Sequence, residues 1–296
     1  MNYEYFNVFL VVGKHKNITR AAQELYTSQP AVTRTIKKLE AELGCQLFTR
    51  TKNGVEFTKE GARLYTFVES SAIQLSRGMD EIANSVNSTT GTIRIGATST
   101  ALDEYLYSYL DKMSKAYPHM HFVVSSSSND KTIDRLNNKL IDIAVVSTPY
   151  HTPRDTLQAI KLSEFKDVVV CGNEYKDLLN KKLNLKDLEN YPFLTLSKDM
   201  QLREFLDDIF IKEKININPI VETNSVSILL PLVINNMGLA IIPETVAKRS
   251  LETGKLHILD VDYDFPVREI HLLYDTSFVL PRVVREFLKS IQEEDS

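Results

Sequence analysis

The sequence lacks several features that define well-known classes of protein. It has no tryptophan and only two cysteines, Cys45 and Cys171, which lie far apart in the chain. Two such cysteines cannot build a disulfide framework, so we expect the reducing cytoplasm as the location. No apolar run approaches the ~20 residues of a membrane helix. The start, MNYEYFNVFLVV, has no basic segment and no small-residue cleavage site, so we expect no signal peptide.

Common catalytic and metal-binding motifs are also missing. HExxH, CxxC and GxSxG do not occur, nor does the phosphate-loop pattern, and no GxGxxG follows an apolar run. His119 and His121 in PHMHF have the spacing of two ligands on one strand face, but an exposed strand start explains them better. Cys171, within VVVCG, is expected to be a buried structural thiol rather than a redox sensor, and Cys45 to fill a small core. We therefore predict a protein that is not an enzyme, with no catalytic residue, metal or cofactor.

What the chain does have is the composition of a globular protein with uneven charge. Of its 296 residues, 43% are hydrophobic and 25% charged, which suits two or three folded domains. Residues 1–65 contain ten lysines and arginines against six glutamates, whereas the rest has 25 basic against 33 acidic residues. A small basic domain joined to a larger acidic one is typical of a domain that binds a polyanion, followed by a domain with a different function.

Three helical patterns follow one another in the basic segment. The first covers residues 2–14, and the second carries Ala21, Ala22 and Leu25, with Thr19 expected to cap it through its hydroxyl. The third begins after Ser28, has Pro30 in its first turn and ends at Gly44. The short gap between the second and third patterns predicts a helix-turn-helix motif at about residues 18–37.

The third helix has an apolar stripe and a polar side. Val32, Ile36 and Leu39 repeat at helical spacing, so they should face the core. In a helix-turn-helix the opposite side of this helix enters the major groove, where Gln reads adenine and Arg reads guanine. The residues that we expect to contact DNA from this motif are Thr19, Ser28, Gln29, Pro30, Thr33, Arg34 and Lys37.

A hairpin is predicted directly after this helix. Two short β-like runs, 47–51 and 55–58, flank Asn53-Gly54, a strong two-residue turn signal. Arg50 and Lys52 lie on this hairpin, where they could contact phosphates or the minor groove. The hairpin would form a wing, at about residues 47–58.

Here the sequence resembles the LysR-type transcriptional regulators. This family usually has Ser at the position of Thr33 and often at that of Asn17, and both differences keep a short polar side chain. The residues that carry the resemblance are Phe9, Ala21, Ala22, Leu25, Ser28, Gln29, Pro30, Ala31, Val32, Thr33, Ile36, Leu39, Glu40, Leu43, Gly44, Leu47, Phe48, Arg50, Thr58 and Gly61. The resemblance implies a winged helix-turn-helix domain at 1–58 and binding to double-stranded promoter DNA.

A long helix is expected next, over 59–90, with 84–91 as a polar hinge at its end. An almost heptad seam runs along it, made of Leu64, Val68, Ser71, Leu75, Met79, Ile82 and Val86. Such a seam favours pairing with a second helix over packing on its own domain. The resemblance likewise implies a dimerisation helix here, hence a homodimer, and tetramers are common in the family.

From residue 91 the pattern changes to apolar runs that alternate with helical stretches, which predicts an α/β domain with largely parallel strands. The expected strands are 92–97, 121–126, 142–147, 167–172, 193–196, 219–223, 239–243 and 268–275. The resemblance implies an effector-binding domain over 91–296 that is similar to two-lobed periplasmic solute-binding proteins. Its first lobe would combine 91–162 with 267–296, and its second would be 163–266.

Small polar residues follow several of these strands. Strand ends and helix N-termini suit anions, so the sequence favours a small carboxylate-like effector between the lobes, although each residue could also be a simple helix cap. The expected effector-binding residues are Thr98, Ser99, Thr100, Ser147, Thr148, Thr195, Asn224 and Ser225, with 125–128 as a further candidate.

Together these features predict a regulator that binds DNA, itself and a small effector, with RNA polymerase as a further partner and no membrane. Two alternatives stay open. A solute-binding transport component would share the C-terminal fold, and a nucleoid architectural protein would bind DNA without sequence preference.

Overall fold

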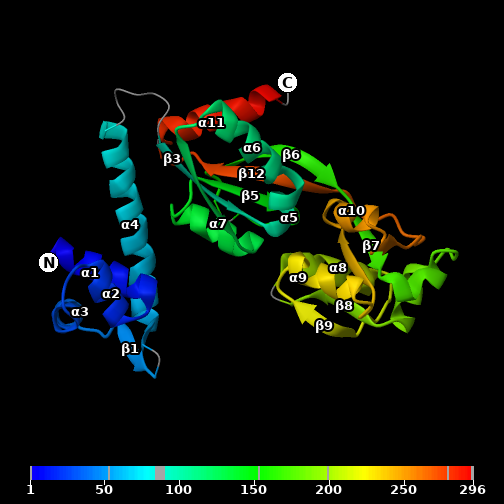
Figure 1. The fold of residues 1–296 in the computed structure, drawn as a ribbon, viewed down its shortest axis with the longest axis horizontal. Helices are drawn as coiled ribbons and strands as arrows, with labels where there is room; N and C mark the ends of the chain where they lie inside the picture. The colour runs from blue at the N-terminus through cyan, green and yellow to red at the C-terminus, as the bar shows by residue number, and fades with distance from the viewer. Residues whose placement is uncertain are drawn as a thin grey trace. The chain divides into compact units, whose positions relative to one another are not determined.

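Figure 1 shows the computed structural model, which describes residues 2–52, 54–83, 91–152, 154–198, 200–278 and 280–294. The chain divides into two compact units, mainly the residues up to 85 and mainly those from 86 onward. Each unit has its own hydrophobic core. Asn53 of the expected turn, Val86 of the expected seam and most of the expected hinge at 84–91 lie outside the described residues.

The N-terminal unit begins with three helices, α1 (Tyr3–His15), α2 (Ile18–Glu24) and α3 (Gln29–Leu43). The α3 boundaries confirm the prediction, because the Ser28 hydroxyl accepts a bond from the N–H of Ala31 and Gly44 ends the helix at φ 71°. Ala21 and Ala22 are almost fully buried, since small side chains let the helices approach closely. The core holds the predicted stripe, together with α1 and wing residues.

The predicted cap of α2 is wrong. The helix begins at Ile18, and Asn17, not Thr19, accepts the bond from the N–H of Arg20 with its side-chain oxygen. Asn17 has the extended backbone that an N-cap needs, whereas Thr19 already lies inside the helix.

The wing consists of β1 (Phe48–Thr51) and β2 (Gly54–Phe57), paired antiparallel. The N–H of Val55 donates to the carbonyl of Lys16 at 2.9 Å, which ties the hairpin to the turn between α1 and α2. The long helix α4 follows, over Lys59–Ala83. Its first turn passes so close to Leu47 that a Cβ on Gly61 would lie 2.0 Å from the Leu47 carbonyl oxygen.

The C-terminal unit has two lobes, and lobe one is built on a five-stranded sheet in the order β4-β3-β5-β12-β6. Its last strand and helix come from the end of the chain. In chain order the elements are β3 (Gly91–Ala97), α5 (Ser99–Ala101), η1 (Leu102–Leu106), α6 (Tyr107–Ala116), β4 (Met120–Ser126), α7 (Asn129–Asn137), β5 (Ile143–Ser147), β6 (Leu157–Phe165), β12 (Arg268–Asp275) and α11 (Arg282–Glu294).

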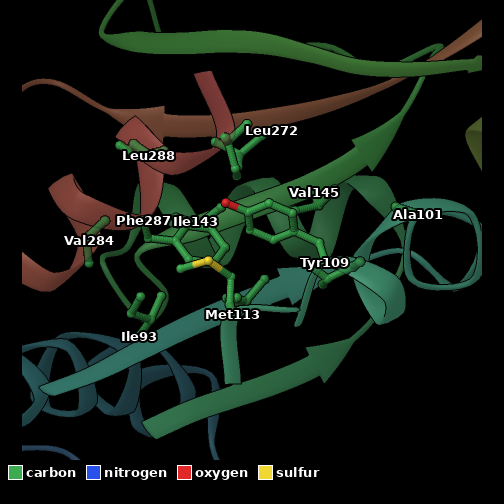
Figure 2. Packing of buried hydrophobic residues seen from close by; sticks show 14 of the residues in the cluster. Ile93, Ala101, Tyr109, Met113, Ile143, Val145, Leu272, Val284, Phe287 and Leu288 are labelled. Atoms are coloured by element: carbon green, nitrogen blue, oxygen red, sulfur yellow. The ribbon is translucent and has the colours of Figure 1, made fainter. Parts of the chain in front are cut away.

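Helices cover both faces of this sheet (Figure 1). On one face α6 and α11 pack against the strands, and on the other α7 does. Figure 2 shows the first of these cores, where Tyr109 of α6 meets Phe287 of α11 edge to face at 5.3 Å between ring centroids. Burying such aromatic side chains contributes roughly 2–3 kcal/mol each to the stability of the fold. The core of lobe one therefore holds the loops at its strand ends in place.

Lobe two contains β7 (Asp167–Cys171) between two antiparallel neighbours, β10 (Ala240–Pro243) and β11 (His257–Ile258). A parallel pair lies beside them, β8 (Phe193–Leu196) with β9 (Pro219–Thr223). The remaining elements are η2 (Asn173–Leu178), η3 (Leu185–Asn190), α8 (Gln201–Lys212), α9 (Val226–Ile234) and α10 (Glu244–Glu252).

Two expectations about the strands need correction. Pairing is mixed rather than largely parallel, because β12 runs antiparallel to both β5 and β6, as β10 does to β7. The strand β6 was not expected, and it crosses the expected lobe boundary at residue 162. It pairs with β12 along its whole length, so the change from one sheet to the other falls near Lys166.

Among the helices that the structure describes, none combines the length and the apolar character required to cross a membrane.

Candidate functional site

The outward side of α3 gathers most of the predicted DNA-contacting residues. A shallow groove on this helix is lined by Gln29, Pro30, Thr33, Arg34, Lys37, Lys38 and Ala41. Apart from Thr33 and the flanking Ala31, which are half-buried, the side chains on this face are exposed. The buried stripe of Val32, Ile36 and Leu39 holds the opposite side of the helix in the core. Lys38 and Ala41 were missed by sequence reasoning, although their helical spacing from Arg34 and Lys37 places them on this face.

The cations of this unit fall into two groups. Lys14 is paired with Glu24 at 2.8 Å, and these two charges largely cancel. In contrast, Arg34, Lys37, Arg50 and Lys52 make no ion pair with any carboxylate among the residues that the structure describes. Exposed cations without a carboxylate partner keep their charge available for phosphates.

Thr19 and Ser28 support the N-terminal end of α3. The Thr19 hydroxyl donates to Oε1 of Gln29 over 3.5 Å, a long bond that orients the carboxamide. The Ser28 hydroxyl is occupied by the cap of α3. Arg50 lies on β1 and Lys52 just after it, both exposed, while the tie of Val55 to Lys16 fixes the wing beside the helices.

In the C-terminal unit a cavity of about 380 Å³ opens between the lobes. Two of its walls are helix starts, because Thr98 caps α5 and Ser225 caps α9. Thr98 and Ser225 therefore each cap a helix and line the cavity at the same time. Six of the eight predicted effector-binding residues line the cavity: Thr98, Ser99, Thr100, Ser147, Asn224 and Ser225.

The other two predicted residues do not line it. The Thr148 hydroxyl accepts a bond from the N–H of Glu269 at 2.8 Å. Thr195 is buried within β8, and its neighbour Leu196 faces the cavity instead. Successive side chains of a strand point to opposite faces, so Leu196 and Thr195 cannot both do so. Of the further candidates, Ser126, Ser127 and Ser128 line the cavity, while Ser125 donates to the carbonyl of Ile95 at 3.4 Å.

Sequence reasoning missed much of the cavity wall. Lobe one adds Asn129, Asp130 and Lys131 at the start of α7, and Asn129 donates to the carbonyl of Ser147 at 2.7 Å. Lobe two adds an apolar side, made of Leu196, Met200, Leu202 and Val226. The wall thus combines hydroxyls and amides from both lobes with apolar side chains from lobe two.

Arg268 is the most deeply buried charge of this wall, with 3% of its surface exposed. Its Nη1 donates to both carboxylate oxygens of Asp167, and its Nε donates to the carbonyl of Thr148 at 2.6 Å. Nη2 makes a longer bond of 3.3 Å to the hydroxyl of Ser147. The guanidinium also lies over the ring of Phe165 at 4.7 Å. The signal available in the sequence was an arginine at the first position of the expected strand REIHLLYD.

The cysteines, and the histidines His119 and His121, form neither a redox site nor a metal site among the residues that the structure describes. Cys171 is fully buried, and burial raises the pKa of its thiol to about 11, which confirms the expected structural thiol. Cys45 packs half-buried against the core of the N-terminal unit. His119 and His121 are both exposed at the start of β4, and no cluster of three metal-binding side chains occurs in the described part of the chain.

Comparison with known proteins agrees with this arrangement over both units. A family model described as "Bacterial regulatory helix-turn-helix protein, lysR family" matches residues 3–62, and one described as "LysR substrate binding domain" matches residues 87–296. The chain belongs to the LysR family. It is therefore a DNA-binding transcriptional regulator with an effector-binding domain, and not an enzyme.

Two relatives illustrate the similarity. The HTH-type transcriptional regulator CysL of Bacillus subtilis (strain 168) is 25% identical over 262 residues, which covers 88% of this chain and 87% of CysL. The regulator BbuR of Bordetella bronchiseptica is 26% identical over 254 residues, covering 86% of this chain and 77% of BbuR.

Solved structures share the fold over the full length. The crystal structure of CbnR, a LysR family transcriptional regulator, has a TM-score of 0.75 at 17% identity and covers 100% of both chains. CbnR complexed with its target DNA matches with a TM-score of 0.74 at 18% identity, covering 99% of both chains.

Proposed function

We propose that this LysR-family regulator reads a specific promoter sequence through the exposed side of α3 and responds to a small anionic metabolite. The observation that carries the proposal is the side of α3 itself, where Gln29, Arg34 and Lys37 share one groove and the two cations lack carboxylate partners among the described residues. A helix face that is only solvated would be stabilised by pairs of opposite charges. A face that binds phosphates instead needs cations without carboxylate partners.

Within this proposal the side chains divide into two roles. Gln29, Thr33 and Arg34 lie in the groove, where they would contact base edges, with Pro30 packed beside them and Thr19 orienting the Gln29 carboxamide. Lys37, Arg50 and Lys52 would bind phosphates and fix the register, and Ser28 would hold the start of α3.

We further propose that α4 pairs with its copy in a second chain, so that the protein is a homodimer or a tetramer built from dimers. This helix has large apolar side chains that are exposed to solvent: Phe67, Leu75, Met79 and Ile82. Three of them belong to the expected seam, whose members Leu64 and Val68 are half-buried. Pairing would place two α3 helices on two half-sites about one helical turn, or a multiple, apart.

The effector would bind in the cavity between the lobes. A small anion suits its hydroxyls, its amides and the helix starts at Thr98 and Ser225. Binding would favour one lobe arrangement over another, shift the spacing of the paired helices on DNA and change access of RNA polymerase to the promoter. A protein with this task would work in the cytoplasm.

Fluorescence anisotropy tests the DNA-reading part. The full chain is titrated into the duplex upstream of its own gene and into a scrambled duplex of equal composition, at several salt concentrations. A preference of ~10³-fold or more for the natural duplex supports specific reading. Equal affinities with a steep salt slope would instead show binding without sequence preference, and no binding to either duplex would show that this side of α3 is only a solvated helix face.

A further inference from the structure

The buried guanidinium of Arg268 has donor capacity that the protein does not use. An arginine carries five N–H groups. Nε donates to Thr148, both bonds to Asp167 start from Nη1, and Nη2 makes one long bond, to Ser147. One N–H of Nη2 is therefore left over, in a side chain that is 3% exposed and lines the cavity.

The position of this spare donor is set by its neighbour. Arg268 and Ser147 both line the cavity, and the bond between them joins Nη2 to the Ser147 hydroxyl. The Nη2 end of the guanidinium therefore lies at the cavity wall, next to a hydroxyl that can rotate to donate as well. An oxyanion placed there would receive two hydrogen bonds, one of them from a charged donor.

We propose that Arg268 is a ligand-binding residue of this cavity, and that the ligand is a singly charged carboxylate with a short apolar chain. The inference deepens the proposed effector site and rests on it. One carboxylate oxygen takes the Nη2 N–H of Arg268 and the Ser147 hydroxyl, while Nη1 stays on Asp167.

The charge of the wall selects one negative charge rather than two. The formal charges of Lys131 and Asp130, which both line the cavity, sum to zero, and Arg268 is neutralised by its ion pair with Asp167. What remains is the partial positive charge at the starts of α5, α7 and α9, at most roughly half a charge each. Together these match a monoanion, whereas a dianion would leave a charge uncompensated in a partly enclosed site.

The apolar chain of the ligand follows from the apolar side chains that lobe two adds to the wall. Leu196, Met200 and Val226 present carbon and sulfur there, with Leu202 beside them. These side chains offer no charged donor to a second carboxylate, but they can cover a short alkyl chain.

The test measures how butyrate, succinate, sulfate and phosphate in the millimolar range bind to the full chain, by ligand-observed NMR and by the shift in thermal unfolding. Butyrate is expected to bind more tightly than the other three. Arg268→Lys keeps a positive charge beside Asp167 but removes the forked donor, so butyrate affinity is expected to fall by ~10-fold or more.

Arg203→Lys is the matched control. Arg203 is also buried, pairs with Asp207 and Glu222 and does not line the cavity, so its variant should keep wild-type butyrate affinity. Equal butyrate binding by Arg268→Lys and wild type would overturn the role of Arg268. Preference for succinate, sulfate or phosphate, or no butyrate binding to wild type, would overturn the ligand class. Selective DNA binding is measured on the same samples without any of the four anions. A failure of the proposed DNA reading is therefore distinguished from a failure of the proposed ligand site.

Discussion

Nη1 of Arg268 lies 3.1 and 3.0 Å from the two carboxylate oxygens of Asp167, in a pair whose side chains are 3% and 1% exposed. Arg268 begins β12 of lobe one, and Asp167 begins β7 of lobe two. The ion pair therefore joins the lobes at the point where the chain passes between their sheets. A charge buried this deeply needs a partner of opposite charge.

We expect Asp167→Asn to lower the free energy of unfolding by about 3–5 kcal/mol, because it leaves the Arg268 charge buried and uncompensated. Replacing both residues by apolar ones, Arg268→Met with Asp167→Leu, should recover most of this loss, since no charge remains in the interior. Urea denaturation followed by circular dichroism measures both. A loss below about 1 kcal/mol for Asp167→Asn would show that the pair is hydrated.

Two glycines of α4 should respond in opposite ways to alanine. At Gly61 a Cβ would lie 2.0 Å from the Leu47 carbonyl oxygen, whereas at Gly78 nothing lies within 4 Å. Gly61→Ala must therefore push the helix away from the wing, and we expect it to destabilise the N-terminal unit by roughly 2 kcal/mol or more. Gly78→Ala should stabilise it by up to about 1 kcal/mol through helix propensity. Thermal unfolding of the two variants distinguishes these outcomes, and similar melting temperatures would contradict the close contact at Gly61.

The elements that could be predicted from the sequence are those with local signals. The start and end of α3 follow from Ser28, Pro30 and Gly44, and the strand at 193–196 was predicted with its observed bounds. The strand β6 was missed because a register shift opposite Ile270 and His271 interrupts its alternation. Its polar positions then resemble a loop.

The cavity was predicted only in part for a related reason. Strand ends and helix caps are local, so Thr98, Ser147 and Ser225 could be named in advance. Arg268 and Asp167 are 101 residues apart, and only the return of the chain into lobe one brings them together. No spacing in the sequence predicts that contact, although each of the two charged residues is the first residue of its strand.

Tyr26 is expected to destabilise the turn in which it lies. It lies between α2 and α3 at φ 51° and is 98% exposed, so its side chain packs against almost nothing. A left-handed backbone costs a residue with a Cβ roughly 1–2 kcal/mol, and Gly avoids this cost. Tyr26→Gly should therefore raise the free energy of unfolding, by about 1 kcal/mol. Tyr3→Gly, at an exposed helical position, should lower it instead, and a loss of stability in both variants would show that Tyr26 makes a contact of its own.

Cys171 should resist thiol reagents in the folded protein. Because burial raises the pKa of the thiol to about 11, the reactive thiolate is scarce at pH 8 even before access is considered. Mass spectrometry after treatment with iodoacetamide should find Cys45, which is half-buried, modified well before Cys171. In denaturant the two should react at similar rates. Early modification of Cys171 under native conditions would mean that β7 opens readily.

The two roles proposed for the α3 cations can be separated by their effects on different DNA. Arg34→Ala should cost about 1–3 kcal/mol on the natural duplex and relax the preference at one base position, because a bidentate contact to guanine is lost. Lys37→Ala should weaken binding to natural and scrambled duplexes alike and reduce the slope of log affinity against log salt by about 1, since one phosphate contact is lost. Lys14→Ala is the control, because Lys14 is already paired with Glu24 and should leave both quantities unchanged. If Arg34→Ala weakened both duplexes equally, Arg34 would belong with the phosphate contacts, and base reading would rest on Gln29 and Thr33.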